Sequence, residues 1–156
     1  MVMEDGLVEL LNRLKANGYI RGIGTNRTNT MDRVIMDYDL ESHFDMVVTA
    51  ADVENPKPAP DQLNKIMAEF ELSPREILFV GDSEYDQKAA QTADTLFMAF
   101  KQAGLDAHFH VRSMEDRHLA LRNDLATTRS EPEQGAETAH YARQDQAFRP
   151  MAGFTG

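Results

Sequence analysis

The segment ILFVGDSEYD at residues 77–86 indicates the class of fold most directly. Four apolar residues that favour a strand run directly into Gly81 and a polar turn, and helical spacing follows over residues 84–93. A short apolar run bounded in this way is typical of a buried strand of a parallel sheet, which delivers polar side chains at its carboxyl end. The stretch therefore predicts an α/β protein with functional carboxylates at Asp82 and Asp86.

The alternation of strand and helix patterns continues on both sides of this stretch. Apolar residues recur at helical spacing in some segments and form short, partly β-branched runs in others. We expect helices at residues 4–17, 30–39, 62–71 and 84–93, and strands at residues 19–25, 44–49, 77–80, 95–99 and 108–111. This order predicts an α/β fold with a Rossmann-like parallel sheet and flanking helices, whose functional loops lie at the carboxyl edge of the sheet.

The charge and composition of the chain exclude several classes of protein. The 156 residues include 26 acidic and 16 basic ones, so the net charge is −10, which disfavours nucleic acid and acidic membranes as partners. The chain has no cysteine, which excludes disulfides, thiolate metal sites and a cysteine nucleophile. No apolar run is long enough for a membrane span, and the start MVMEDG does not resemble a signal peptide. We expect a cytoplasmic protein.

The composition changes after about residue 121. The remaining residues include few aliphatic side chains, show no sustained periodicity and are rich in Gln, Thr, Glu and Gly. Such a segment buries little apolar surface. The sequence thus predicts a folded core at residues 1–121 and a disordered tail at residues 122–156.

Five polar residues at predicted strand ends and in one loop suggest a common chemistry. Thr25 and Asn26 follow a strand and offer a hydroxyl, an amide and backbone N–H groups to an anion. Lys57 lies between two prolines, which limit the positions of its ammonium group. Asp82 and Asp86 supply the hard oxygen ligands that Mg²⁺ prefers. An anion cradle, a cation and a carboxylate pair together suit phosphoryl chemistry.

Three segments carry a resemblance to a known family. GIGTNR at residues 22–27, NPKPAPD at 55–61 and LFVGDSEYD at 78–86 resemble, in order and spacing, motifs two, three and four of the haloacid dehalogenase-like superfamily. Within it, the chain is similar to the phosphoglycolate phosphatase and β-phosphoglucomutase-like branch. The resemblance covers about residues 4–121 and implies a Mg²⁺-dependent phosphatase of small organic phosphates.

The resemblance also implies a role for each candidate residue. Thr25 would hydrogen-bond the phosphoryl group, and Asn26 would assist through its backbone. Lys57 would neutralise developing charge and orient the nucleophile. Asp82 would bind Mg²⁺, and Asp86 would assist directly or through water. The partner of the site would be a small phosphorylated metabolite.

Two parts of the family pattern do not match this sequence. The family's aspartate nucleophile and second aspartate belong to a first strand before residue 19, and a helical cap follows that strand; residues 1–18 instead have a helical pattern. In the family this strand lies between the strands that end at Thr25 and Gly81, so we expect two unpaired interior edges and a possible homodimer through one of them. We expect a truncated, inactive chain.

Other interpretations of the same residues remain open. The chain could be a non-catalytic module that binds phosphate and Mg²⁺, a module that recruits a partner strand, or a degenerate fragment.

The D-x-D of Asp37 and Asp39 falls on a helical pattern, and we reject it as the missing nucleophile motif. Residues 22–27 match a dinucleotide fingerprint only in part. His108 and His110 lack an evident third metal ligand, which favours a packing or surface role.

Overall fold

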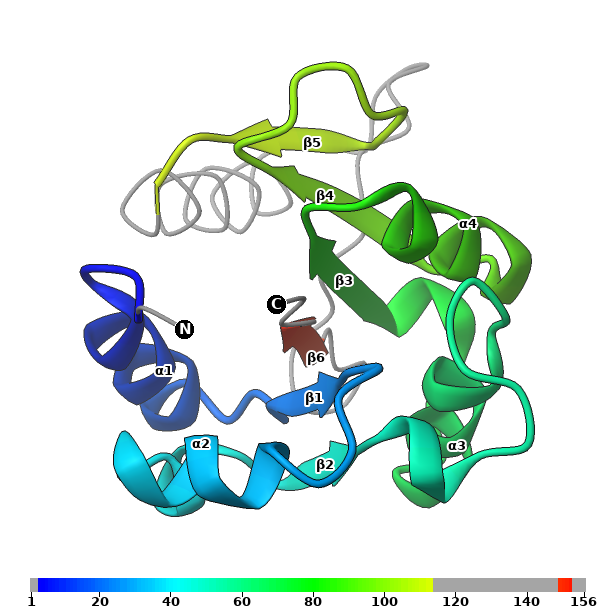
Figure 1. Cartoon of the computed structure of the whole chain (residues 1–156). Coiled ribbons are helices and arrows are strands. Elements are labelled where there is room, and N and C mark those ends of the chain that lie inside the picture. Colours follow the sequence, from blue (N-terminus) through cyan, green and yellow to red (C-terminus); the bar gives the residue numbers. More distant parts are fainter. Residues whose placement is uncertain (1–2, 114–148, 153–156) are drawn as a thin grey trace.

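The computed structural model describes residues 3–113 and 149–152 of the chain. Strands and helices alternate as the sequence predicts (Figure 1). The helices are α1 (Leu7–Ala16), α2 (Met31–Asp37), α3 (Asp61–Glu69) and α4 (Glu84–Ala93), and the strands are β1 (Gly22–Gly24), β2 (Met46–Val48), β3 (Ile77–Gly81), β4 (Leu96–Phe100), β5 (Phe109–Val111) and β6 (Arg149–Ala152). Short 3₁₀ turns lie at Glu41–His43, Ala50–Asp52 and Pro74–Glu76.

The strands form two parallel sheets. β1 pairs with β2, and the second sheet has the order β5-β4-β3-β6. Every described ladder is parallel, with Phe79 opposite Phe97 where β3 meets β4. Parallel strands need crossover connections, and helix α2 supplies the one between β1 and β2 and helix α4 the one between β3 and β4, as in other α/β proteins. The predicted α/β class, with a parallel sheet and flanking helices, is confirmed.

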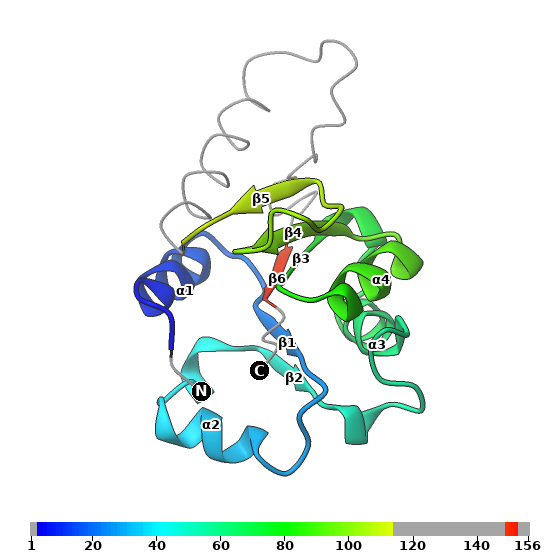
Figure 2. The same ribbon diagram turned by 45° about the horizontal axis from the view of Figure 1, so that its top comes forward.

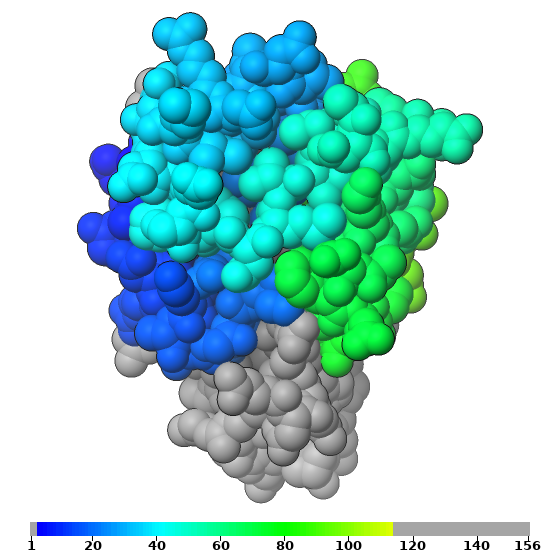
Figure 3. Space-filling view, turned by 90° about the horizontal axis from the view of Figure 1, so that it is seen from below, coloured from blue at the N-terminus to red at the C-terminus, as the bar shows by residue number. Residues whose placement is uncertain are grey.

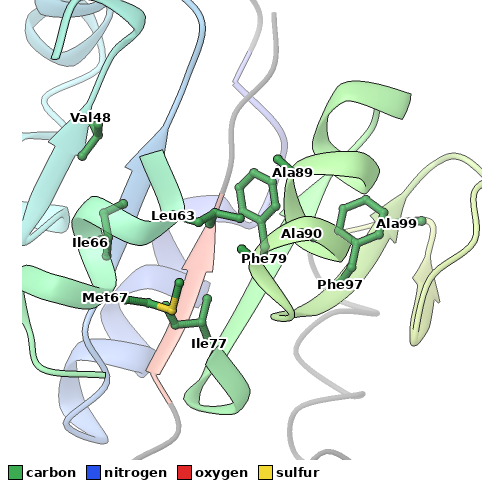
Figure 4. Packing of buried hydrophobic residues seen from close by; sticks show 11 residues of the cluster. Val48, Leu63, Ile66, Met67, Ile77, Phe79, Ala89, Ala90, Phe97 and Ala99 are labelled. Atoms are coloured by element: carbon green, nitrogen blue, oxygen red, sulfur yellow. The ribbon is translucent and has the colours of Figure 1, made fainter. Parts of the chain in front are cut away.

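Alternate residues of β3 pack against helices on opposite faces of the sheet. Leu78 and Val80 belong to the core cluster that includes residues of α1, whereas Ile77 and Phe79 belong to the cluster with α3 and α4. Figure 4 shows this second cluster, in which the Phe79 and Phe97 rings lie 6.2 Å apart between their centroids. All five residues of β3 are buried, as expected for a central strand.

Strand β6 changes one expectation from the sequence. It pairs with β3 and contacts β1, so it lies between the strands that end beside Thr25 and Asp82 (Figure 2). The expectation of an unpaired β3 edge is therefore wrong: Arg149–Ala152 supplies backbone partners there. The remaining residues of the predicted tail at 122–156 lie outside the described residues, and its disorder stays a prediction, as does the homodimer.

The remaining sequence predictions can be compared with the described elements. Most element bounds agree within about three residues, and the D-x-D segment at Asp37 lies at the end of helix α2, as its spacing indicated. Pro74–Glu76 begins with the predicted capping box of Ser73 and Glu76. Within the described residues, no helix is long and apolar enough to span a membrane. The cytoplasmic location stays a prediction.

The region of α2 and the loop between β2 and α3 lie side by side on one face of the molecule (Figure 3). The loop contains Lys57, and the segment before α2 contains Thr25 and Asn26. Thr25 is tied to the β1–β2 sheet because its N–H donates to the carbonyl of Val48 over 2.9 Å. The fold thus brings the second and third motif segments together.

Candidate active site

Lys57 occupies the centre of a buried network. Its ammonium donates to Asp86 Oδ1 over 2.7 Å and to the carbonyl oxygen of Gly24 over 3.0 Å. It also lies 5.5 Å from the centroid of the Phe79 ring. Because an ammonium group has three N–H donors and the described residues accept two, one donor remains for an anionic ligand. Lys57 therefore joins the end of β1 to the first turn of α4 through a single positive charge.

Asn26 holds the loop of Lys57 against the end of β1. Its side-chain Nδ2 donates to the carbonyl of Lys57 over 2.9 Å, and its Oδ1 accepts from the Lys57 N–H over 3.0 Å. The side chain thus satisfies both backbone groups of one residue, as a neighbouring strand would. Any contact of Asn26 with an anion then falls to its backbone.

Thr25 is buried at the carboxyl end of β1, with 1% of its surface exposed. Its hydroxyl oxygen accepts from the Arg27 N–H over 3.1 Å, so the hydroxyl proton can still be donated. A hydroxyl oriented in this way suits a phosphoryl oxygen. The backbone carbonyl of Thr25 is held by the side chain of Gln62.

Gln62 is a supporting residue that the sequence interpretation missed. Its side-chain Nε2 donates to the Thr25 carbonyl over 2.7 Å, and the residue is fully buried in the first turn of α3. Its Oε1 has no hydrogen-bond partner among the described residues. The signal was available: Gln62 and Ile66 are four residues apart on one helix face, and a polar side chain at such a position needs a buried partner.

Asp86 links the start of α4 to Lys57. Its Oδ2 accepts from the N–H groups of Asp82 and Ser83 over 3.2 and 3.3 Å, and from the Ser83 hydroxyl over 2.9 Å. The N–H of Asp86 donates back to Ser83 Oγ, which completes a capping box at the helix start. Both carboxylate oxygens are thus engaged by protein groups.

Gly81 makes this position of Asp86 possible. A Cβ atom at residue 81 would lie 2.5 Å from Asp86 Cβ and 2.6 Å from its Cγ. These separations are too short for any side chain, so the approach of α4 to β3 requires glycine. The glycine of the VGD sequence is therefore explained by the packing of the Asp86 side chain.

Asp82 follows β3 and, unlike Asp86, is exposed as a whole residue. Its carboxyl group is nevertheless partly shielded from water. This burial, and then the neighbouring negative charge of Asp86, raise the pKa of Asp82 above its ordinary value. A cation bound beside this carboxylate would relieve that cost. The described residues include no group of three or more His, Asp or Glu side chains arranged to hold a metal ion.

The structure therefore brings most of the candidate residues from the sequence together in one network. Lys57, Asp86, Asn26 and the backbone beside Thr25 form one connected network, and Asp82 adjoins it through its N–H bond to Asp86. His108 lies apart from this network, and its Nδ1 accepts from the Phe97 N–H over 3.0 Å, which is a structural role.

Comparisons with known proteins identify relatives of this chain. The chain is 39% identical over 92 residues to pyrophosphatase PpaX of Bacillus cereus, an alignment that covers 58% of this chain and 43% of that protein. A haloacid dehalogenase-superfamily hydrolase of subfamily IA from Geobacter sulfurreducens superposes with a TM-score of 0.73 and 40% identity, over 78% of this chain and 57% of that chain. The chain thus spans less than half the length of this curated relative.

A further solved structure shares the fold. The putative hydrolase YfnB of Bacillus subtilis, bound to magnesium, superposes with a TM-score of 0.69 at 22% identity, over 76% of this chain and 55% of that one. The model of the family described as haloacid dehalogenase-like hydrolase matches residues 2–100, which contain β1 to β4 and every residue of the network. Since these residues form the parallel core and the candidate site, the chain belongs to the haloacid dehalogenase-like hydrolase family.

Proposed function

We propose that this chain is the phosphoryl-binding part of a Mg²⁺-dependent phosphatase-type hydrolase of small phosphorylated metabolites. The observation that supports the proposal most is the buried ammonium of Lys57, held at 2.7 Å from Asp86 and 3.0 Å from the Gly24 carbonyl. An ammonium fixed between the end of β1 and the first turn of α4, with one donor left, is suited to neutralise charge on a phosphoryl group.

The other residues divide the work of binding. The Thr25 hydroxyl donates to a phosphoryl oxygen, and the Asn26 backbone lies at the same turn. Gln62 and the Asn26 side chain hold these groups in place through their bonds to the Thr25 and Lys57 backbones. Preorganised donors of this kind stabilise charge that develops in a transition state because they need little reorganisation.

The Asp82 carboxylate is the main direct protein ligand that we propose for Mg²⁺. An exposed carboxylate whose negative charge is opposed by burial and by Asp86 gains from a cation, and Mg²⁺ commonly binds one or two carboxylates while keeping its waters. When bound, the ion would supply neutralisation of phosphate oxygens. Direct binding of Mg²⁺ by Asp86 is a weaker part of the proposal, because its two oxygens already accept four protein hydrogen bonds.

We assign the nucleophile to none of the described residues. The acidic group nearest to Lys57 is Asp86, which serves as its ion-pair partner and as the cap of α4. We therefore expect the chain by itself to bind phosphate and Mg²⁺ and to show no turnover of its own.

The test of this proposal uses thermal unfolding with Mg²⁺, with inorganic phosphate and with pyrophosphate, the last because one relative is a pyrophosphatase. Mg²⁺ should raise the melting temperature of the unmodified chain and of the control variant Asp106→Asn, which changes an exposed carboxylate in the loop between β4 and β5. Asp82→Asn should lose the shift. If Mg²⁺ and both anions leave the unmodified chain unchanged, the proposal fails.

A non-catalytic binding module is the second candidate. The engagement of both Asp86 oxygens by protein groups favours it, because the described residues then offer binding groups without a free pair of carboxylates. Hydrolysis of p-nitrophenyl phosphate by this chain, abolished in Asp82→Asn, would exclude the binding module. Binding without turnover is expected of this chain under both candidates and does not separate them.

A further inference from the structure

Arg27 follows Thr25 and Asn26 at the carboxyl end of β1, and its backbone supports the candidate site. Its N–H donates to the Thr25 hydroxyl oxygen over 3.1 Å, so the main chain of Arg27 contacts the hydroxyl that suits a phosphoryl oxygen. Figure 3 shows the region of α2 beside the loop of Lys57, and Arg27 lies in the segment between β1 and α2. The residue therefore borders the proposed phosphoryl site.

The side chain of Arg27 has a donor that no described residue satisfies. The residue is partly buried, and its Nε is excluded from water and lacks a hydrogen-bond partner among the described residues. A charged group in this state is unfavourable, because its N–H has lost hydration without gaining an acceptor. An anion bound to the guanidinium would supply the missing acceptor.

The charge of Arg27 is also without a partner in the part of the chain that the structure describes. No acidic side chain there forms an ion pair with it, although acidic residues outnumber basic ones in this chain. The charge of Lys57, by contrast, is balanced by Asp86. Three other arginines each have an aspartate oxygen within 3.5 Å, and these are Arg21, Arg33 and Arg75. Arg27 thus supplies an unbalanced positive charge beside the site.

The neighbouring polar side chains are already engaged. The Asn26 side chain bonds to both backbone groups of Lys57. Gln62 donates to the Thr25 carbonyl, and the Lys57 ammonium retains one donor for the phosphoryl group itself. A guanidinium carries five N–H donors in a planar fork, which matches two oxygens of one phosphate or carboxylate group. Arg27 is therefore the side chain at this turn that is best suited to a further anionic group.

We propose that Arg27 is a specificity-determining residue that binds a second anionic group of the substrate, a phosphate or a carboxylate next to the transferred phosphoryl group. The inference rests on the proposed function, because it takes the Thr25 hydroxyl as a contact of the phosphoryl group. Since the Arg27 backbone is bonded to that hydroxyl and three methylene groups separate its Cα from Nε, the guanidinium can reach a neighbouring group of the same small molecule. A substrate with one anionic group gains nothing from Arg27.

Calorimetric titration with Mg²⁺ in excess tests the proposal with three probes. Methyl phosphate has no second anionic group, pyrophosphate has a second phosphate, and phosphonoacetate has a carboxylate. Arg27→Gln should weaken the binding of pyrophosphate, phosphonoacetate or both by at least about tenfold and that of methyl phosphate by less than about threefold. The control Arg33→Gln, whose side chain is 85% exposed on α2, should change none of the three. Equal losses for all probes, or no loss, would overturn the proposal.

The pattern of losses identifies the second group. A loss for pyrophosphate alone assigns a phosphate, a loss for phosphonoacetate alone assigns a carboxylate, and a loss for both assigns either group to the guanidinium.

Arg27→Lys separates recognition of charge from a structural role. Both variants keep the backbone N–H that holds the Thr25 hydroxyl. Lysine retains the positive charge without the planar fork, so Arg27→Lys should bind the affected probe at least about threefold more tightly than Arg27→Gln does. Equally weak binding to the two variants would contradict recognition through charge.

The unmodified chain keeps the proposal testable if the variants do not fold. The nuclear magnetic resonance signal of the Arg27 Nε–H should shift with pyrophosphate or phosphonoacetate and stay in place with methyl phosphate. If no probe binds the unmodified chain, this inference and the proposed function both fail. If methyl phosphate binds and the Arg27 signal ignores the other two probes, only the role of Arg27 is wrong.

Discussion

Lys57 Nζ lies 2.7 Å from Asp86 Oδ1, and the two side chains are 1% and 0% exposed. An ion pair excluded from water in this way gains from attraction and loses the hydration of two charges, so its net contribution to folding is small. Its importance lies in the cost of leaving either charge alone. The main effect of the pair is therefore to fix the position of the Lys57 loop relative to α4.

Loss of one partner of this pair should be strongly destabilising. Asp86→Asn leaves the buried ammonium of Lys57 without its counter-charge, and we expect a loss of about 3–5 kcal/mol in the free energy of unfolding. Asp94→Asn is the matched control, because Asp94 is 71% exposed in its pair with Arg75 and should cost less than about 1 kcal/mol. Urea unfolding measures both. Equal losses would contradict the assigned burial of the Lys57 pair.

A single methyl group at Gly81 should disturb the same contact. Gly81→Ala places a Cβ atom 2.5 Å from Asp86 Cβ, so α4 must shift away from β3, and we expect a loss of about 1–3 kcal/mol or more. Gly104→Ala is the control, since no atom lies within 4 Å of its added Cβ. Thermal unfolding of the two variants gives the comparison. A Gly81→Ala chain as stable as the control would show that α4 accommodates the methyl group.

The pH dependence of stability should report the strain at Asp82. Burial and the charge of Asp86 raise the pKa of Asp82, so the native state binds this proton more tightly than the unfolded state does. The carboxylate therefore opposes folding above its native pKa, and the cost disappears as the pH falls through that value towards the unfolded one. Asp82→Asn should raise stability at neutral pH, and the two curves should converge in acid.

Asp52 provides a control of opposite sign. The backbone N–H of Thr49, and then its hydroxyl, lower the pKa of Asp52 by hydrogen bonding to its carboxylate. A lowered pKa contributes stability above the unfolded pKa that is lost as the pH falls through the native value. Asp52→Asn should therefore lower stability at neutral pH. If Asp82→Asn also lowers it, the assigned direction at Asp82 is wrong. Urea unfolding at a series of pH values measures all three chains.

Gln62 should matter to anion binding as well as to folding. Gln62→Met keeps the size of the side chain but removes the bond to the Thr25 carbonyl, and we expect a loss of about 1–3 kcal/mol in stability. Gln91→Met changes an exposed residue of α4 and should be nearly neutral. Titration calorimetry with phosphate should show weaker binding to Gln62→Met at a temperature where it remains folded. Unchanged affinity would reduce Gln62 to a purely structural residue.

Sequence patterns were sufficient to predict the class of fold, most element bounds and the candidate residues. Periodicity identified helices and strands because burial of apolar side chains imposes the repeat of each element. Thr25, Lys57 and Asp82 were identifiable because each follows a strand or lies in a proline-stiffened loop, where local residue types limit the backbone. The glycine before Asp82 was visible too, but its reason was not.

The contacts of these residues could be known only from the folded chain. Three features depend on groups from separate elements that meet in space. They are the hydrogen bonds that engage both Asp86 oxygens, the need for glycine at residue 81, and the bond from Gln62 to the Thr25 carbonyl. Strand β6 shows this most clearly. Arg149–Ala152 is short, contains a proline and has no strand pattern of its own, yet it pairs with β3 because a buried strand edge needs backbone partners. Local sequence preference does not encode such a requirement, since the need arises from β3 and not from the segment that satisfies it.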